Sequence, residues 1–194
     1  MVSRVALEEA RLPYRIEVLN FAAGDQSRPD FAKASPLGKV PTLVIDGKPL
    51  TENAAIQVYI AALRPEAGLF PASRDPRDLA EVQKGLSFCG GTLHPIVRGI
   101  FNPGRVTNGD PDGVRERSIE LAVKSFGYAE RRLEEAGWWL GTWSIIDVYL
   151  NWAWSVAERG GFDGSNYPQL TVLQSRLLAR PGFARVTEWE AVAR

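Results

Sequence analysis

Short runs within the first quarter of the chain alternate between apolar and polar positions, which is the pattern of a half-buried β-strand. Alternation over 14–19 predicts one strand, and the short β-branched run at 42–45 predicts a second. Residues 48–50 predict a returning strand, because Asp46-Gly47 between them is a hairpin signal. A type I′ turn needs a positive φ at both of its central residues, and Asp-Gly supplies this readily.

Helical periodicity replaces this alternation further along the chain. Residues 64–78 contain three prolines and a glycine, which is typical of a domain boundary. After it, the pattern predicts helices over 79–101 (bent or broken near Pro95), 114–136, 145–157 and 167–178. The third of these is apolar almost all round, so we expect it to be the buried centre of an all-helical domain. The organisation expected is an α/β domain over 1–72 and a helical domain over 76–194.

Helix starts are marked by residues that satisfy free backbone N–H groups. Thr51 can cap a helix from about Glu52 to Leu63. Ser144 and Asp147 have the spacing of a capping box at the start of the apolar helix. A further helix is expected over 3–10.

Composition narrows the classes of function. The 194 residues carry 23 Lys and Arg against 23 Asp and Glu, a balance that argues against a nucleic-acid-binding surface. No apolar run approaches the length of a membrane-spanning helix. The single Cys, Cys89, cannot form an internal disulfide, which favours a cytoplasmic setting, and it most often is a small buried hydrophobe. One His and one Cys also argue against a zinc site, so we expect no metal.

The stretch 35–62 resembles the glutathione-binding segment of the cytosolic, bacterial-type glutathione S-transferase family. The resemblance rests on the Val40-Pro41 step, the Asp-Gly hairpin and the Thr51-Glu52-Asn53 helix start. In that family the proline is cis, the valine backbone pairs with the cysteinyl part of glutathione, and an acidic-then-hydroxyl pair holds the γ-glutamyl end. Asn53 departs from the usual Ser, although its amide can still donate.

The family implies a fold and an activity. It implies a thioredoxin-like α/β N-terminal domain followed by an all-α domain, with glutathione as co-substrate and a small electrophilic acceptor. It also implies a homodimer, acting neither on nucleic acid nor at a membrane. The same fold serves isomerases, dehalogenases and non-catalytic binding or regulatory proteins, so these alternatives stay open.

Each candidate site residue has a simpler alternative role. Glu52 and Asn53 also suit a helix start, and Lys39, a third possible glutathione contact, also suits a solvated loop. The resemblance places an acceptor site between the domains, with His94, Arg98 and Phe101 as its lining. His94 fits helix capping or packing equally well.

No catalytic residue can be named from this sequence. In the family, a strand and a loop with the catalytic Tyr, Ser or Cys come before the helix that here spans 3–10. That strand lies in the sheet between those matching 14–19 and 42–45, and unpaired backbone groups beside the gap would cost roughly 1–3 kcal/mol each. We therefore expect the polypeptide to start upstream of Met1, with a genuine short form as the alternative.

Overall fold

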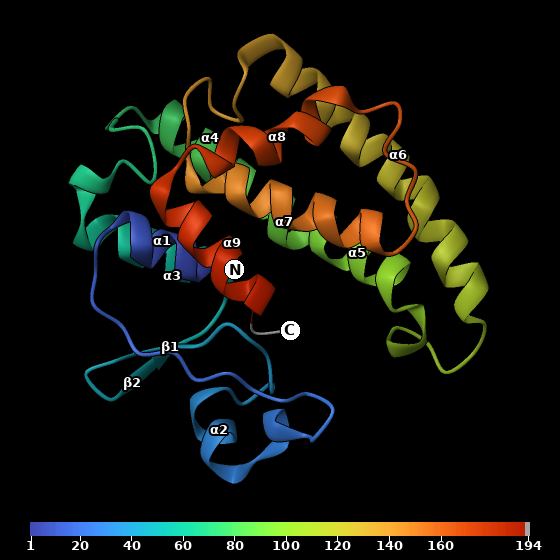
Figure 1. Cartoon of the computed structure of the whole chain (residues 1–194), viewed down its shortest axis with the longest axis horizontal. Coiled ribbons are helices and arrows are strands. Elements are labelled where there is room, and N and C mark those ends of the chain that lie inside the picture. Colours follow the sequence, from blue (N-terminus) through green and yellow to red (C-terminus); the bar gives the residue numbers. More distant parts are fainter. Residues whose placement is uncertain (193–194) are drawn as a thin grey trace.

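A helical body makes up most of the computed structural model, and a small α/β extension projects from its lower edge (Figure 1). The structure describes residues 1–192. The helices are α1 (Val2–Glu9), α2 (Pro29–Ala34), α3 (Asn53–Leu63), α4 (Pro76–Ser87), α5 (His94–Phe101), α6 (Pro111–Ala136), α7 (Ile145–Arg159), α8 (Pro168–Leu178) and α9 (Pro181–Val192). Strands β1 (Leu43–Ile45) and β2 (Lys48–Leu50) form one sheet.

The predicted hairpin is confirmed. Strands β1 and β2 are antiparallel, with Leu43 opposite Leu50 and Ile45 opposite Lys48. Asp46 and Gly47 have φ values of 49° and 77°, the positive values that a tight turn of this kind requires. The turn therefore fixes the register of the two strands.

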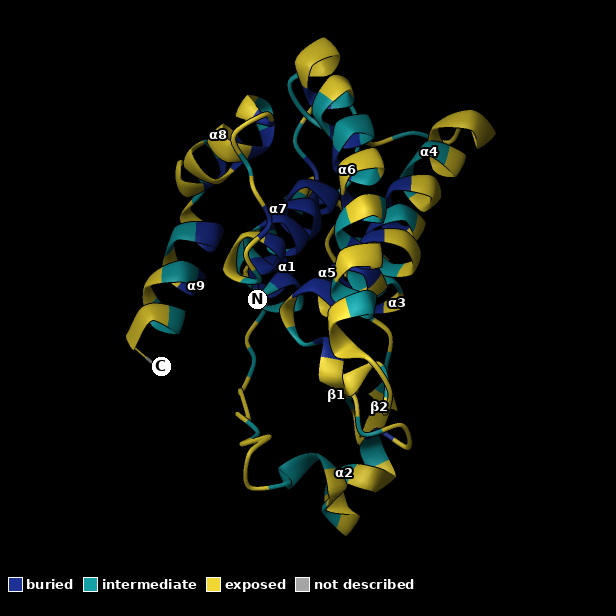
Figure 2. Cartoon of the chain, turned by 90° about the vertical axis from the view of Figure 1, so that its right-hand side faces the viewer, coloured by how far each residue is buried: buried dark blue, intermediate teal, exposed yellow. Residues whose placement is uncertain are grey.

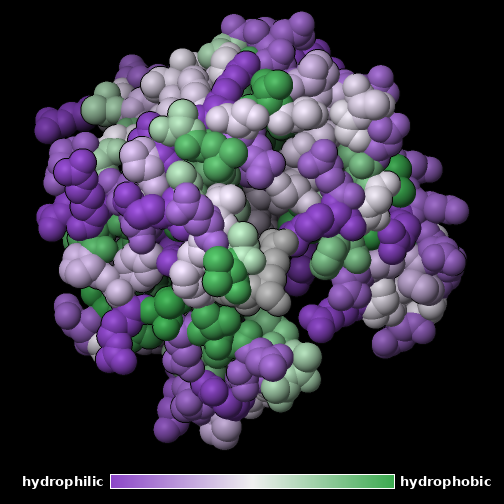
Figure 3. Space-filling model, viewed as in Figure 1, coloured by the Kyte–Doolittle hydropathy of each residue, from purple (hydrophilic) through white to green (hydrophobic). Residues whose placement is uncertain are grey.

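The strand predicted over 14–19 is wrong. This segment is extended but belongs to no strand, and no backbone hydrogen bond joins it to β1 in the part of the chain that the structure describes. Ile16 and Val18 remain 49% and 64% exposed. Figure 3 shows hydrophobic surface in the lower part of the molecule. Alternation predicts which side chains share a face, but a strand also needs a neighbour for its backbone groups.

Helix α7 is the centre of the core, as predicted. It lies inside the helical body in Figure 2, and most of its side chains are buried. Phe126 of α6 meets Trp154 of α7 edge to face, with ring centroids 5.0 Å apart. Trp139 and Trp154 are almost fully buried, so these two side chains serve packing. Among residues 1–192, none of the helices combines the length and the apolar character that a membrane crossing requires.

The helix predicted over 79–101 is interrupted close to Pro95, as predicted. A π-helical segment, Phe88–Leu93, joins α4 to α5 and contains Gly90 and Gly91. Pro95 lies in the first turn of α5. Pro95 has no N–H to donate to a carbonyl of the preceding turn, and the wider π-helical turn lies directly before it. The glycines, which favour helix least after proline, coincide with the break.

Replacing Gly85 with alanine is expected to destabilise the fold by about 1–3 kcal/mol, since overpacking forces neighbouring groups to move. A Cβ atom at Gly85 would lie 2.5 Å from Trp139 Nε1 and 2.7 Å from Ile146 Cδ1. Urea unfolding followed by tryptophan fluorescence measures the change. Gly91→Ala is the matched control, because nothing lies within 4 Å of its added Cβ atom. Equal stability of the two variants would contradict close packing of α4 on α7.

Candidate functional site

The loop before β1 supplies a backbone edge with free hydrogen-bonding groups. Buried Ser35 braces the loop: its hydroxyl donates to the Lys39 carbonyl at 2.8 Å and accepts from the Lys39 N–H at 3.0 Å. The Val40-Pro41 peptide bond is cis, as the resemblance implied. Within residues 1–192 the Val40 N–H and C=O have no hydrogen-bond partner. An extended peptide could therefore pair with Val40.

The start of α3 is arranged differently from the prediction. Glu52, not Thr51, occupies the N-cap position, and no side chain caps the helix. Glu52 has φ 67° and ψ 114°, a conformation that costs a residue other than glycine roughly 1–3 kcal/mol. This turn moves Thr51 out of the cap position. The first N–H groups of α3 and its positive dipole end remain open to an anion.

The Asn53 side chain is held from two sides. Its Oδ1 accepts from the Ser3 hydroxyl at 2.7 Å and from Gln57 Nε2 at 2.9 Å. Gln57 Nε2 also lies 3.1 Å from Ser3 Oγ, so α1 and α3 are linked by a closed polar triangle. The amide nitrogen of Asn53 consequently faces away from both partners.

His94, on α5, contacts two aromatic side chains of α7. Its Nδ1 is 3.2 Å from the Tyr149 hydroxyl, and its ring centroid is 4.6 Å from that of Trp152. Burial lowers the pKa of His94, Arg98 and Lys39 lower it further, and Glu52 opposes them. The imidazole is therefore neutral at pH 7.

Tyr149 of α7 is the polar partner of His94. Burial raises the pKa of its phenol to about 12, and the Asn53 side chain opposes this shift. The phenol thus keeps its proton at any ordinary pH. Polar side-chain contacts link α1 to α3 and α5 to α7.

The structure brings together only part of the predicted acceptor site. Arg98 lies one turn beyond His94 and is exposed, whereas Phe101 lies about 10 Å further along α5 than His94, at 1.5 Å per residue. The Arg159 guanidinium lies 5.4 Å from the centroid of the Phe101 ring. Phe101 therefore belongs to the far end of α5, next to the end of α7.

Three residues at the site were not predicted from the sequence: Ser3, Gln57 and Tyr149. The sequence could have indicated Gln57, because it lies one turn from Asn53 and is a polar residue among the buried positions of α3. It gave no indication of Ser3 or Tyr149, since both are distant from Asn53 in the sequence. Cys89, as expected, is buried, and burial raises the pKa of its thiol, so it stays protonated.

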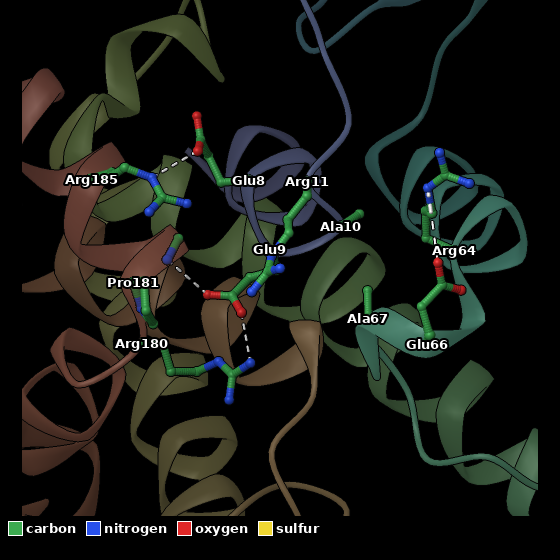
Figure 4. A pocket seen from close by; sticks show the side chains of 11 residues that line it. Glu8, Glu9, Ala10, Arg11, Arg64, Glu66, Ala67, Arg180, Pro181 and Arg185 are labelled. Atoms are coloured by element: carbon green, nitrogen blue, oxygen red, sulfur yellow. Dashed lines mark hydrogen bonds and ion pairs between the residues drawn. The ribbon is translucent and has the colours of Figure 1, made fainter.

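A cavity lies between α1, the turn after α3 and the start of α9 (Figure 4). Its volume is about 660 Å³, and its charged side chains are mostly paired within its wall. Arg180 contacts Glu9 at 2.6 Å, and Arg185 contacts Glu8 at 2.9 Å. These ion pairs hold α9 against α1. None of the predicted glutathione contacts lines this cavity. No cluster of three metal-ligating side chains occurs within the described range 1–192.

Comparison with known proteins decides the family. Residues 1–62 match the family model for the glutathione S-transferase N-terminal domain. Glutathione S-transferase GST-4.5 of Xanthomonas campestris pv. campestris is 30% identical over 184 residues, which cover 92% of this chain and 88% of that protein. The chain belongs to the glutathione S-transferase family. A second relative, the disulfide-bond oxidoreductase YfcG of Escherichia coli, is 31% identical over 186 residues, covering 90% of this chain and 83% of YfcG.

Solved structures support the glutathione S-transferase fold along the whole chain. A glutathione transferase homologue from Sulfitobacter, crystallised with glutathione, superposes with a TM-score of 0.87 at 27% identity and covers 97% of this chain and 92% of its own. The predicted fold class, a thioredoxin-like N-terminal part with an all-helical C-terminal part, is thereby confirmed. The boundary between 72 and 76 stays a prediction.

Proposed function

We propose that this glutathione S-transferase-like protein binds glutathione between the Val40 edge and the start of α3. The observation that carries the proposal is that the Val40 backbone is unpartnered and that α3, whose N-cap is Glu52, starts without a side-chain cap. The fold, and neighbours crystallised with glutathione, support the choice of ligand.

Each end of glutathione has a chemically matched partner in this proposal. The Val40 N–H and C=O pair with the cysteinyl backbone. The free N–H groups of α3 and the Asn53 amide receive the γ-glutamyl carboxylate, while Glu52 accepts from its ammonium group. Lys39 provides a positive charge for a carboxylate. The cis Pro41 shapes the loop that presents Val40.

The reaction proposed is addition of the glutathione thiol to a small, apolar electrophile. The acceptor would lie beside α5, against His94 and Arg98, with Phe101 at the far end of the same helix. Homodimer formation and a cytoplasmic location are part of the proposal, as is typical of the family.

Two measurements on the same protein test the proposal. Retention on immobilised glutathione, with elution by free glutathione, tests the ligand. Turnover of 1-chloro-2,4-dinitrobenzene, a generic electrophile, tests the reaction. Retention with turnover supports a transferase, and retention without turnover supports a non-catalytic glutathione-binding protein. A folded protein that shows neither would contradict the proposal.

A further inference from the structure

We propose that a second cavity, between α7, α8 and α9, binds a small primary amine that carries a hydroxyl group at its other end. The Glu158 carboxylate receives the ammonium group, and the Asn151 amide hydrogen-bonds to the hydroxyl group. The cavity has a volume of about 350 Å³, and its lining includes Asn151, Trp152, Ser155, Glu158 and Arg159 of α7 and Glu190 of α9. None of the proposed glutathione contacts lines it, so this inference does not rest on the proposed function.

Asn151 is a buried polar residue without a hydrogen-bond partner. It is only 1% exposed, and its Oδ1 is enclosed by protein and accepts no hydrogen bond. Within residues 1–192 its Nδ2 makes no hydrogen bond either, so the amide nitrogen is the group that faces the cavity. A buried amide that has lost its contacts with water destabilises the fold unless another group replaces them. A ligand in the cavity supplies that replacement.

Glu158 is the second polar group of the cavity without a partner. It lies seven residues after Asn151, so both side chains are on one face of α7, about 10 Å apart along the helix axis. Burial raises the pKa of the Glu158 carboxyl, and no neighbouring cation opposes that rise. A partly desolvated carboxylate is stabilised by a cation that binds beside it. The two positions therefore favour an elongated ligand with an ammonium group at one end.

The other charged groups of the cavity already have partners. Glu190 Oε1 lies 3.0 Å from the amino nitrogen of Met1. Arg159 Nε donates to the Ser155 carbonyl at 3.1 Å. Glu158 is therefore the carboxylate that remains for the ammonium group of a ligand.

Trp152 provides apolar surface for the middle of the ligand. Its indole is half-buried, lines the cavity and lies 4.6 Å from the His94 ring, measured between centroids. An aromatic or aliphatic body can pack against such a ring. A hydroxyl group suits Asn151 because it can accept from the amide nitrogen and can also donate to the amide oxygen if the amide is rotated.

Tyramine is the probe, because its ammonium and phenol groups lie at opposite ends of one ring. Isothermal titration calorimetry without glutathione compares it with phenethylamine, which lacks the hydroxyl group, and with 4-ethylphenol, which lacks the ammonium group. We expect phenethylamine to bind about 2- to 10-fold more weakly than tyramine, and 4-ethylphenol at least about 10-fold more weakly. In 3-(4-hydroxyphenyl)propionate a carboxylate replaces the ammonium group. Binding of this anion as tight as that of tyramine, or no binding of tyramine, would overturn the proposal.

Glu158→Gln tests the ammonium contact. The variant should bind tyramine and phenethylamine at least about 10-fold more weakly and 4-ethylphenol as the native protein does. Glu188→Gln is the matched control, because Glu188 is an exposed carboxylate of α9 that does not line the cavity. Equal weakening in the two variants would assign the binding to general surface charge and overturn the proposal.

Asn151→Leu tests the hydroxyl contact with a side chain of nearly the same shape. Tyramine should then bind no more tightly than phenethylamine, whose own affinity should not change. The melting temperature should be equal to or higher than that of the native protein, because an apolar group replaces an unpartnered amide. A preference for tyramine that persists in the folded variant, or a lower melting temperature, would overturn the role of Asn151.

Discussion

Replacement of Asp147 by alanine is expected to lower the free energy of unfolding by roughly 2–5 kcal/mol. The carboxylate is fully buried and accepts from Trp139 N–H and Ser144 N–H, each at 2.8 Å, and from the Ser144 hydroxyl at 3.0 Å. Removing it leaves two buried backbone donors unpaired, at a cost of roughly 1–3 kcal/mol each. For a chain of this length the melting temperature should fall by roughly 5–15 °C.

Urea denaturation monitored by tryptophan fluorescence measures this loss. The control is Asp163→Ala, since Asp163 also accepts a nearby backbone N–H, from Ser165 at 2.9 Å, but lies in solvent. That variant should lose less than about 1 kcal/mol. Equal losses in the free energy of unfolding of the two variants would show that burial does not strengthen the contribution of the Asp147 hydrogen bonds to stability.

Acid should relieve part of the cost of burying Asp147. Burial raises the pKa of its carboxyl from 3.8 to about 6. The folded state therefore binds more protons than the unfolded state between these values, and the contribution to stability falls as the pH rises from about 4 to about 6. The native protein should lose stability relative to Asp147→Asn across this window, by up to about 3 kcal/mol at 1.36 kcal/mol per pKa unit. A difference that does not vary with pH would contradict the raised pKa.

The second large effect is expected at Glu52. Under the proposed function, Glu52→Gln should weaken glutathione binding roughly 10- to 100-fold, because a hydrogen bond between charged groups contributes about 1.5–3 kcal/mol. Isothermal titration calorimetry measures the dissociation constant. Glu66→Gln, which changes an exposed carboxylate on the turn after α3, should bind as the native protein does.

Glu52→Gly separates the role of the side chain from that of the backbone. Glycine adopts a φ of 67° without steric cost, so the variant should keep the turn and unfold with a free energy up to about 1 kcal/mol higher. It should nevertheless bind glutathione as weakly as Glu52→Gln. Unchanged affinity in both variants would remove Glu52 from the binding site.

Local sequence signals predicted the parts of the fold that local chemistry decides. Asp46-Gly47 predicted the hairpin, and the spacing of Ser144 and Asp147 predicted the start of α7, where the Asp147 carboxylate does accept from Ser144. The strand at 14–19 failed because strand formation depends on a pairing partner, which alternation does not encode. Thr51 failed as a cap because the positive φ of Glu52 moves the helix start by one residue.

Only the continuous part of the candidate site could be predicted from the sequence. Val40, Pro41, Glu52 and Asn53 lie in one continuous stretch and were found together. The Asn53 side chain is held by Ser3 on α1, and α1 meets α3 only after folding. Polar residues on separate helices carry no shared spacing in the sequence.

The π-helical segment Phe88–Leu93 determines the rotational phase of α5. Each residue of an α-helix advances by about 100°, so one extra residue in a wide turn rotates everything that follows it by about that angle. The segment also contains Gly90, where an added Cβ atom would lie 3.5 Å from the Tyr149 hydroxyl. Shortening it by one residue would swing His94 away from Tyr149 without altering either side chain. The length of this turn is therefore as much a determinant of the His94 environment as the residues that contact the ring.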